Sequence, residues 1–113
     1  MKLLLMIVAF TLSTAAMANI SCVGSVGVET VKLKIIEETS TDITYEGKIK
    51  DVQFMALYRI DTNKTSMLIN INSLGFAVSG DGPSLSQPKA YIDAGTAAGE
   101  SFELTCRLLV AGT

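Results

Sequence analysis

Apolar and polar residues alternate with a period of two along most of the chain after residue 29, and this pattern constrains the fold more than any other feature of the sequence. It is clearest in three segments: 30–35, 43–50 and 101–108. In the last of these, Leu104 and Cys106 share one face while polar residues occupy the other. A period of two is typical of β-strands with one buried face. We therefore expect three strands here and an all-β domain.

The middle of the chain also alternates, but it is apolar on both faces. In 52–60, Met55 and Leu57 interrupt the polar face, and Leu68 does the same in 66–71. A helix over 52–60 is an alternative, although the aromatic and β-branched residues favour a strand. Met55, Leu57 and Leu68 then form either an exposed patch that contacts a partner or the second face of a buried strand.

Polar and glycine-rich turns separate the alternating segments at short, fairly regular spacing. They lie at 38–42, 61–64, 79–89 and 95–99. Such spacing indicates antiparallel strands rather than strands that alternate with helices. The sequence predicts a small antiparallel β-sandwich or barrel of about six to eight strands. The first strand is expected over 20–28, with a bend or bulge at Gly24 or Gly27, and 90–94 is expected to form a short edge strand.

Residues 1–18 have the three-part layout of a secretory signal peptide. Lys2 supplies the positive start, an apolar run follows over 3–12, and 16–18 reads Ala-Met-Ala, a cleavage pattern. A membrane-spanning helix needs about 20 apolar residues, so we expect no integral membrane span. Cleavage after this segment leaves a single β-domain, 19–113, in the periplasm or outside the cell.

Both cysteines, Cys22 and Cys106, lie in this domain, and an even number of cysteines in an exported protein favours a disulfide. A disulfide needs Cα atoms within about 7 Å of each other. The first and last strands are therefore expected to be neighbours in one sheet, or to face each other across the core. Lipoprotein anchoring at Cys22 is the alternative, but the lipoprotein motif carries an apolar residue where this chain has Asn19.

Charge and composition exclude several kinds of partner and chemistry. Without Lys2, the acidic residues outnumber the basic ones by three, and the basic residues are scattered. Nucleic acids and anionic membranes select clustered Lys and Arg, so neither is expected as a partner. The chain has no histidine, which removes the commonest catalytic base and a common zinc ligand. We expect no catalytic residues, no metal and no cofactor.

The most site-like segment is a glycine-rich loop that contains Gly80, Asp81 and Gly82. Its backbone could hold an anion, or Asp81 could ligate calcium, but calcium takes about six or more oxygen ligands. A turn that requires positive φ at glycine is the simpler interpretation. The other acids are spread over the hairpins and are expected to be solvated surface charges.

These observations predict a non-enzymatic exported β-domain that binds another protein or serves as a structural component of the cell envelope. Two alternatives stay open. One is a small hydrolase that uses Asp81 and a neighbouring carboxylate, and the other is a carrier of small apolar ligands inside a barrel. No feature of the sequence fixes the oligomeric state.

Overall fold

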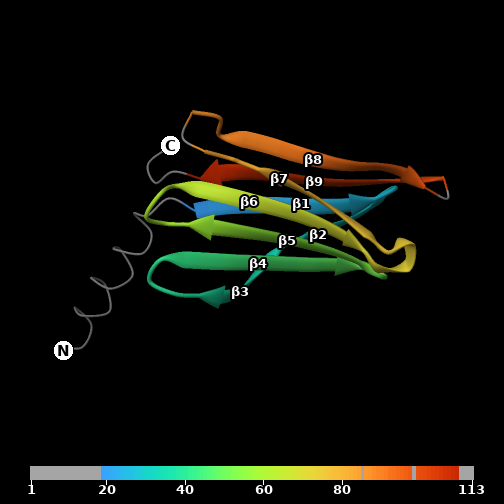
Figure 1. The fold of residues 1–113 in the computed structure, drawn as a ribbon, viewed down its shortest axis with the longest axis horizontal. Helices are drawn as coiled ribbons and strands as arrows, with labels where there is room; N and C mark the ends of the chain where they lie inside the picture. The colour runs from blue at the N-terminus through green and yellow to red at the C-terminus, as the bar shows by residue number, and fades with distance from the viewer. Residues whose placement is uncertain (1–18, 85, 98, 110–113) are drawn as a thin grey trace, which may run out of the picture.

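The computed structural model describes residues 19–84, 86–97 and 99–109 (Figure 1), so the expected signal peptide lies outside the described residues. The described chain forms nine strands and one short 3-10 helix, which confirms the all-β fold and makes 52–59 a strand. No helix in this part of the chain is long and apolar enough to cross a membrane. The elements are β1 (Asn19–Val26), β2 (Glu29–Lys32), β3 (Lys34–Glu38), β4 (Asp42–Ile49), β5 (Val52–Arg59), β6 (Lys64–Ile71), η1 (Asn72–Leu74), β7 (Phe76–Asp81), β8 (Lys89–Ala97) and β9 (Glu100–Leu109).

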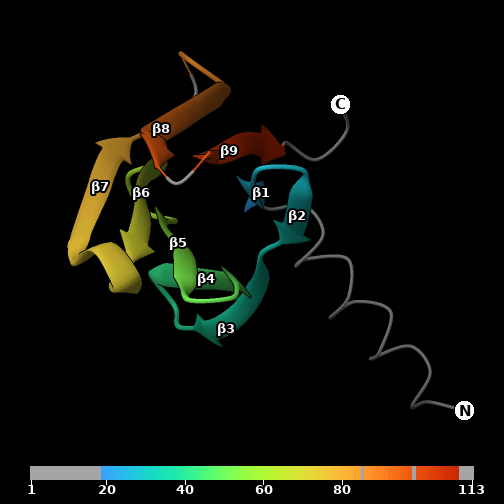
Figure 2. The ribbon, with the colours of Figure 1, turned by 90° about the vertical axis from the view of Figure 1, so that its right-hand side faces the viewer.

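The strands form two antiparallel sheets packed face to face. The four-stranded sheet has the order β2-β1-β9-β8, and the five-stranded sheet has the order β3-β4-β5-β6-β7. Seen end on, the strands follow one another around a ring that encloses the core (Figure 2). Neighbours around the ring are also neighbours along the chain, except that β1 pairs with β9. The edge strand expected at 90–94 lies within the longer β8.

The alternating run that the sequence predicts as one strand is divided between the two sheets at Leu33. β2 ends at Lys32 and β3 begins at Lys34. Leu33 is buried, and its N–H donates to the carbonyl oxygen of Cys22 (2.9 Å). This corner lets the chain leave the four-stranded sheet and enter the five-stranded one, which is why the strands outnumber the sequence expectation by one.

The disulfide joins the first and last strands, as the cysteine count and the alternation predicted. Cys22 of β1 lies directly opposite Cys106 of β9. The two Cα atoms are 4.1 Å apart, the bond spans 84 positions of sequence, and both side chains are fully buried. An intramolecular disulfide is consistent with an oxidising, exported compartment. A sulfur atom in this bond cannot also carry a lipid, so the pairing excludes a lipid anchor at Cys22.

Gly24 of β1 lies directly against the ring of Phe54 of β5, in the contact between the two sheets. Phe54 is completely buried. A Cβ atom at position 24 would lie only 2.5 Å from Cγ of Phe54, so a side chain has no room there. β1 pairs with β9 through Gly24 without any shift in register. No bulge forms at this glycine, which instead leaves room for the ring of Phe54 across the core.

The turn predicted over 79–89 is shorter than expected, because β7 continues through Gly80 and Asp81. Gly80 pairs with Met67 of β6. Only Gly82, with a φ of 111°, has the positive φ that a glycine-rich turn requires. Gly80 and Asp81 are thus strand residues and not loop residues.

Two core tyrosines make the stability of the fold sensitive to alkaline pH. Burial raises the pKa of both Tyr45 and Tyr58 above the ordinary value of 10.0. The N–H of Ile20 donates to the Tyr45 hydroxyl (3.5 Å), and the Tyr58 hydroxyl donates to Oδ1 of Asn63 (2.6 Å). Folding therefore favours the neutral phenols. Their contribution is fully present below the unfolded-state pKa of about 10 and is lost as the pH rises through the higher folded-state values.

We expect the urea concentration at the unfolding midpoint to fall as the pH is raised from about 9 to about 11.5. The comparison is a Tyr45→Phe/Tyr58→Phe double variant, whose midpoint should decline less over the same range because these phenols no longer ionise. Equal declines in the two proteins would show that the tyrosines do not carry the effect.

Candidate functional site

The three apolar residues singled out in the sequence come together on the outer face of the five-stranded sheet. Met55 of β5 lies directly opposite Leu68 of β6, and Leu57 follows on the same face of β5. Their strand neighbours Phe54 and Ala56 point into the core and are buried, whereas Met55 and Leu57 are only half-buried. Met55, Leu57 and Leu68 are called the apolar patch below.

The patch lies in a shallow hollow of about 230 Å³ with a polar rim. Three hydroxyl residues line the hollow beside it: Thr44, Ser66 and Ser79. Charges of both signs lie on the same face, with Glu46 on β4 and with Arg59 two residues after Leu57 on β5. Glu46 pairs with Met55 across β4 and β5 and accepts a hydrogen bond from Nε2 of Gln53. An apolar centre with a polar rim is the usual anatomy of a protein–protein contact surface.

No other element packs against this face in the described part of the chain. The main contacts of β5 and β6 with the four-stranded sheet are with β1, β8 and β9, and those strands lie on the core side (Figure 2). The sequence allowed two interpretations of these three residues: an exposed patch, or the second face of a strand that is buried on both sides. Within the described residues no strand covers this face, so the second interpretation does not apply. The patch is an outward-facing surface.

The site expected at Gly80, Asp81 and Gly82 is not a single loop, because β7 ends at Asp81. Asp81 and Gly82 line an open hollow of about 660 Å³ together with Arg59 and Lys64. The N–H of Gly82 donates to the carbonyl oxygen of Thr65 (2.8 Å), and the Thr65 hydroxyl is buried without a hydrogen-bond partner among the described residues. The glycine backbone therefore closes the end of β6 and does not form a free cradle for an anion. Gly80 lies elsewhere, against Ile92 of β8.

Asp81 also shares the lining of a second hollow with an acid that the sequence did not relate to it. Asp81 of β7 and Glu103 of β9 line a second open hollow of about 710 Å³, with Lys89 and Tyr91 of β8. The two acids come from different sheets, so only the tertiary arrangement relates them. Alternation along a strand gives the face of a residue but not its neighbours, and no sequence signal would have found this pair.

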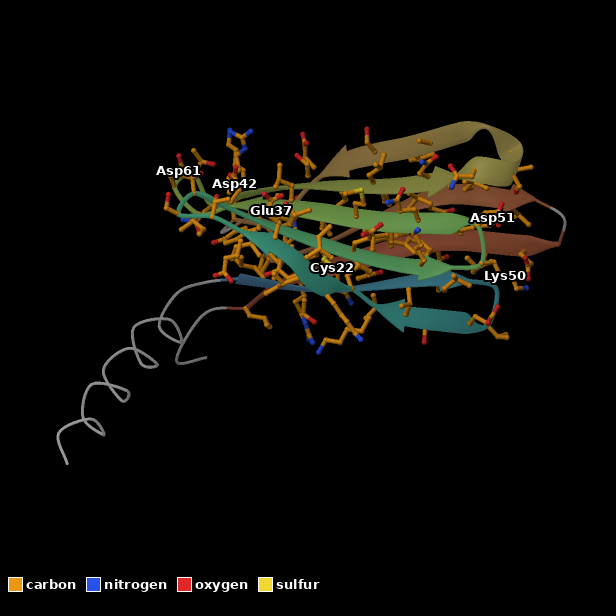
Figure 3. The ribbon with its side chains drawn as sticks, turned by 90° about the horizontal axis from the view of Figure 1, so that it is seen from below. Cys22, Glu37, Asp42, Lys50, Asp51 and Asp61 are labelled. Carbon is orange, nitrogen blue, oxygen red and sulfur yellow. A yellow bond between two sulfur atoms is a disulfide. The ribbon has the colours of Figure 1, made fainter. Side chains whose placement is uncertain are left out.

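The remaining acids are separated along the length of the domain. Asp42 and Asp61 lie at one end, and Asp51 lies at the other (Figure 3). Hydrogen bonds from Ser73, one of them from its N–H (2.9 Å), hold the pKa of Asp51 below its ordinary value. Asp51 thereby ties the turn after β4 to η1. Among the residues described, no group of three or more acid, cysteine or histidine side chains is placed to hold a metal ion.

The interior of the domain is occupied by side chains. Tyr58, Phe54 and Met67 are among the largest of those that are fully buried. A hollow of about 150 Å³ lies at one end of the sandwich, where Phe102 and Ile71 line it. Pockets that hold small organic ligands are usually about 300–1,000 Å³, so this hollow gives no support to the carrier alternative.

Comparison of the chain with protein-family models, with curated proteins and with solved structures finds no match in any of the three.

Proposed function

We propose that the chain is a non-enzymatic binding domain, exported to the periplasm or secreted after removal of residues 1–18, and that it contacts a partner protein through the apolar patch. The domain is held together by a buried disulfide that an oxidising compartment maintains. Its outward surface, and not its packed interior, is then the part available for function.

The observation that carries this proposal is the position of the patch on an uncovered sheet face. The opposite faces of β5 and β6 already supply the core through residues such as Phe54 and Ile69. Met55, Leu57 and Leu68 lie on the other face of these strands and are not part of this core. Apolar residues gathered on an exposed face mark an interaction site.

The rim favours a protein partner over a membrane or a nucleic acid. Charges of both signs lie on the same face as the patch, with Glu46 on β4 and Lys64 on β6. Anionic membranes and nucleic acids bind surfaces on which basic side chains cluster. A mixed rim instead matches the mixed charges that proteins present to one another.

Site-specific photo-cross-linking tests the proposal in cells that export the full chain. A photoreactive amino acid replaces Leu57 in one variant and Val23 in the control. Val23 is also apolar, is 42% exposed, and lies on the outer face of the four-stranded sheet. We expect one adduct of defined mass from position 57, weaker when Leu68→Gln is added, and none from position 23. Equal labelling from both positions, or none from either, would remove the support for the patch as a contact site.

A further inference from the structure

The strand β3 forms an open edge of the five-stranded sheet. It pairs with β4 on one side and has no hydrogen-bonded strand on the other within the described residues. All five of its residues are exposed, including Ile35 at 49% and Ile36 at 55%. An open strand edge offers unpaired N–H and C=O groups to which another strand can be added.

The edges of β7 and β8 are not open in this way. A Cβ atom at Gly80 of β7 would lie 2.5 Å from Ile92 of β8, and one at Gly82 would lie 2.7 Å from Ala90. These two edges therefore cover each other, which leaves β3 and the short β2 as the candidates for strand addition.

A β-bulge in β3 places an acid and a base on the same face. Lys34 lies opposite Glu46, and Glu37 lies opposite Thr44, with the register shift between Ile35 and Glu37. Both partners on β4 belong to the outer face of the sheet, because the residues between and beside them, Tyr45 and Ile43, are buried. In a regular strand, residues three apart lie on opposite faces. The bulge removes that alternation, so Lys34 and Glu37 share the outer face (Glu37 is marked in Figure 3).

This arrangement makes the edge complementary to itself. When two copies of β3 lie antiparallel about a two-fold axis perpendicular to the sheet, residues that face each other must lie on the same face of the sheet. Lys34 of each copy then lies opposite Glu37 of the other, and Ile35 lies opposite Ile36. Opposite charges placed directly across an antiparallel pair are favourable.

The edge strand β2 lacks this property. It also carries an acid and a base three residues apart, Glu29 and Lys32, but β2 pairs with β1 without a bulge. Glu29 lies opposite the buried Val26, and Lys32 lies opposite the exposed Val23. The two charges are on opposite faces and cannot oppose each other about a two-fold axis.

We propose that β3 is a docking edge for a second copy of this chain, and that two copies join their five-stranded sheets into one through antiparallel pairing of β3. The self-complementary order of charges selects a second copy, because a strand of another protein would need both an acid and a base at the same spacing. The inference does not depend on the apolar patch. The two-fold axis places both patches on the same side of the joined sheet.

Charge reversal tests the pairing by sedimentation equilibrium of the purified, disulfide-bonded chain. Wild type is expected to form dimers. The variants Lys34→Glu and Glu37→Lys should each weaken dimerisation about tenfold or more, because each brings two like-charged pairs together. An equimolar mixture of the two variants should dimerise again, because both cross-strand pairs are then of opposite charge. Reversal of Glu29 or Lys32 on β2 is the matched control and should leave the dimer unchanged.

The mixture makes the test independent of folding effects. Lys34→Glu also places like charges together within one chain, opposite Glu46, whereas Glu37→Lys meets Thr44 and does not. Circular dichroism checks that both variants retain the sheet. A wild-type chain that stays monomeric up to millimolar concentration, or a mixture that associates no better than its separate components, would overturn the proposal.

Discussion

Replacing Cys22 and Cys106 together with alanine is expected to destabilise the domain by about 4–5 kcal/mol, because the lost cross-link closes a long loop in the unfolded chain. The loop spans 84 positions, most of the described domain. The bond also lies in the core, where both sulfur atoms are removed from water. The free energy of unfolding of typical domains is only about 5–15 kcal/mol. In a domain this small, the expected loss is most of that free energy.

Thermal and urea unfolding of the oxidised wild type and the double variant measure this effect. A loss of this size corresponds to a midpoint lower by roughly 20–30 °C in a domain of this length. The control is a Ser21→Ala/Arg107→Ala double variant, since these residues form the adjacent pair of the same β1–β9 ladder without a covalent link. A cysteine variant that unfolds at the same urea concentration as this control would show that the cross-link contributes little.

Phe54→Ala is expected to cost about 3–5 kcal/mol, as large-to-small substitutions of buried aromatic residues do. Phe54 is completely buried at the contact between the two sheets. The opposing strand carries a glycine there and has no side chain to fill the space. Urea unfolding measures the loss, and Leu57→Ala on the outer face of the same strand is the control, with an expected cost well below that of Phe54→Ala. Similar costs at the two positions would contradict the placement of Phe54 at the centre of the core.

Gly24→Ala provides a second, independent measure of the same contact. The new methyl group would meet the Phe54 ring, and overpacking of this kind costs about 1–3 kcal/mol. Combining Gly24→Ala with Phe54→Leu should restore part of that loss, since a smaller side chain leaves room for the methyl group. A double-mutant cycle should therefore show a coupling of about 1 kcal/mol or more. Strictly additive effects would show that the two residues do not touch.

The period-two pattern predicted the all-β fold and the inward faces of the strands over 43–50 and 101–108, but not the division of 30–35 into β2 and β3. Leu104 and Cys106 lie in the core as the alternation in 101–108 indicated, and the disulfide requirement correctly placed the first and last strands together. The outward position of Met55 and Leu57 also followed from the pattern. These features are local, because each depends only on which face of its own strand a residue occupies.

The features that depend on neighbouring strands could not be read from the sequence. The corner at Leu33 moves the following residues into the other sheet, and the bulge at Ile36 changes the face on which the following residues lie. Neither position carries a glycine or proline that would have indicated it. The presence of Asp81 and Glu103 in the lining of one hollow depends on how the two sheets are stacked. Gly24 was misinterpreted for the same reason: a glycine in a strand is compatible with a bulge or with close packing, and only the partner across the core distinguishes them.

The position of the disulfide near the chain ends of the β1–β9 ladder determines how the domain responds to mechanical tension. A pull that separates the two ends can open the pairs Asn19–Leu109, Ile20–Leu108 and Ser21–Arg107 one after another. It then meets the covalent bond between Cys22 and Cys106. All the residues between these two cysteines lie outside the path of the load. Such a pull therefore withdraws only the core residues beyond the bond, Ile20 and Leu108, while the domain between the cysteines transmits force through a short covalent link.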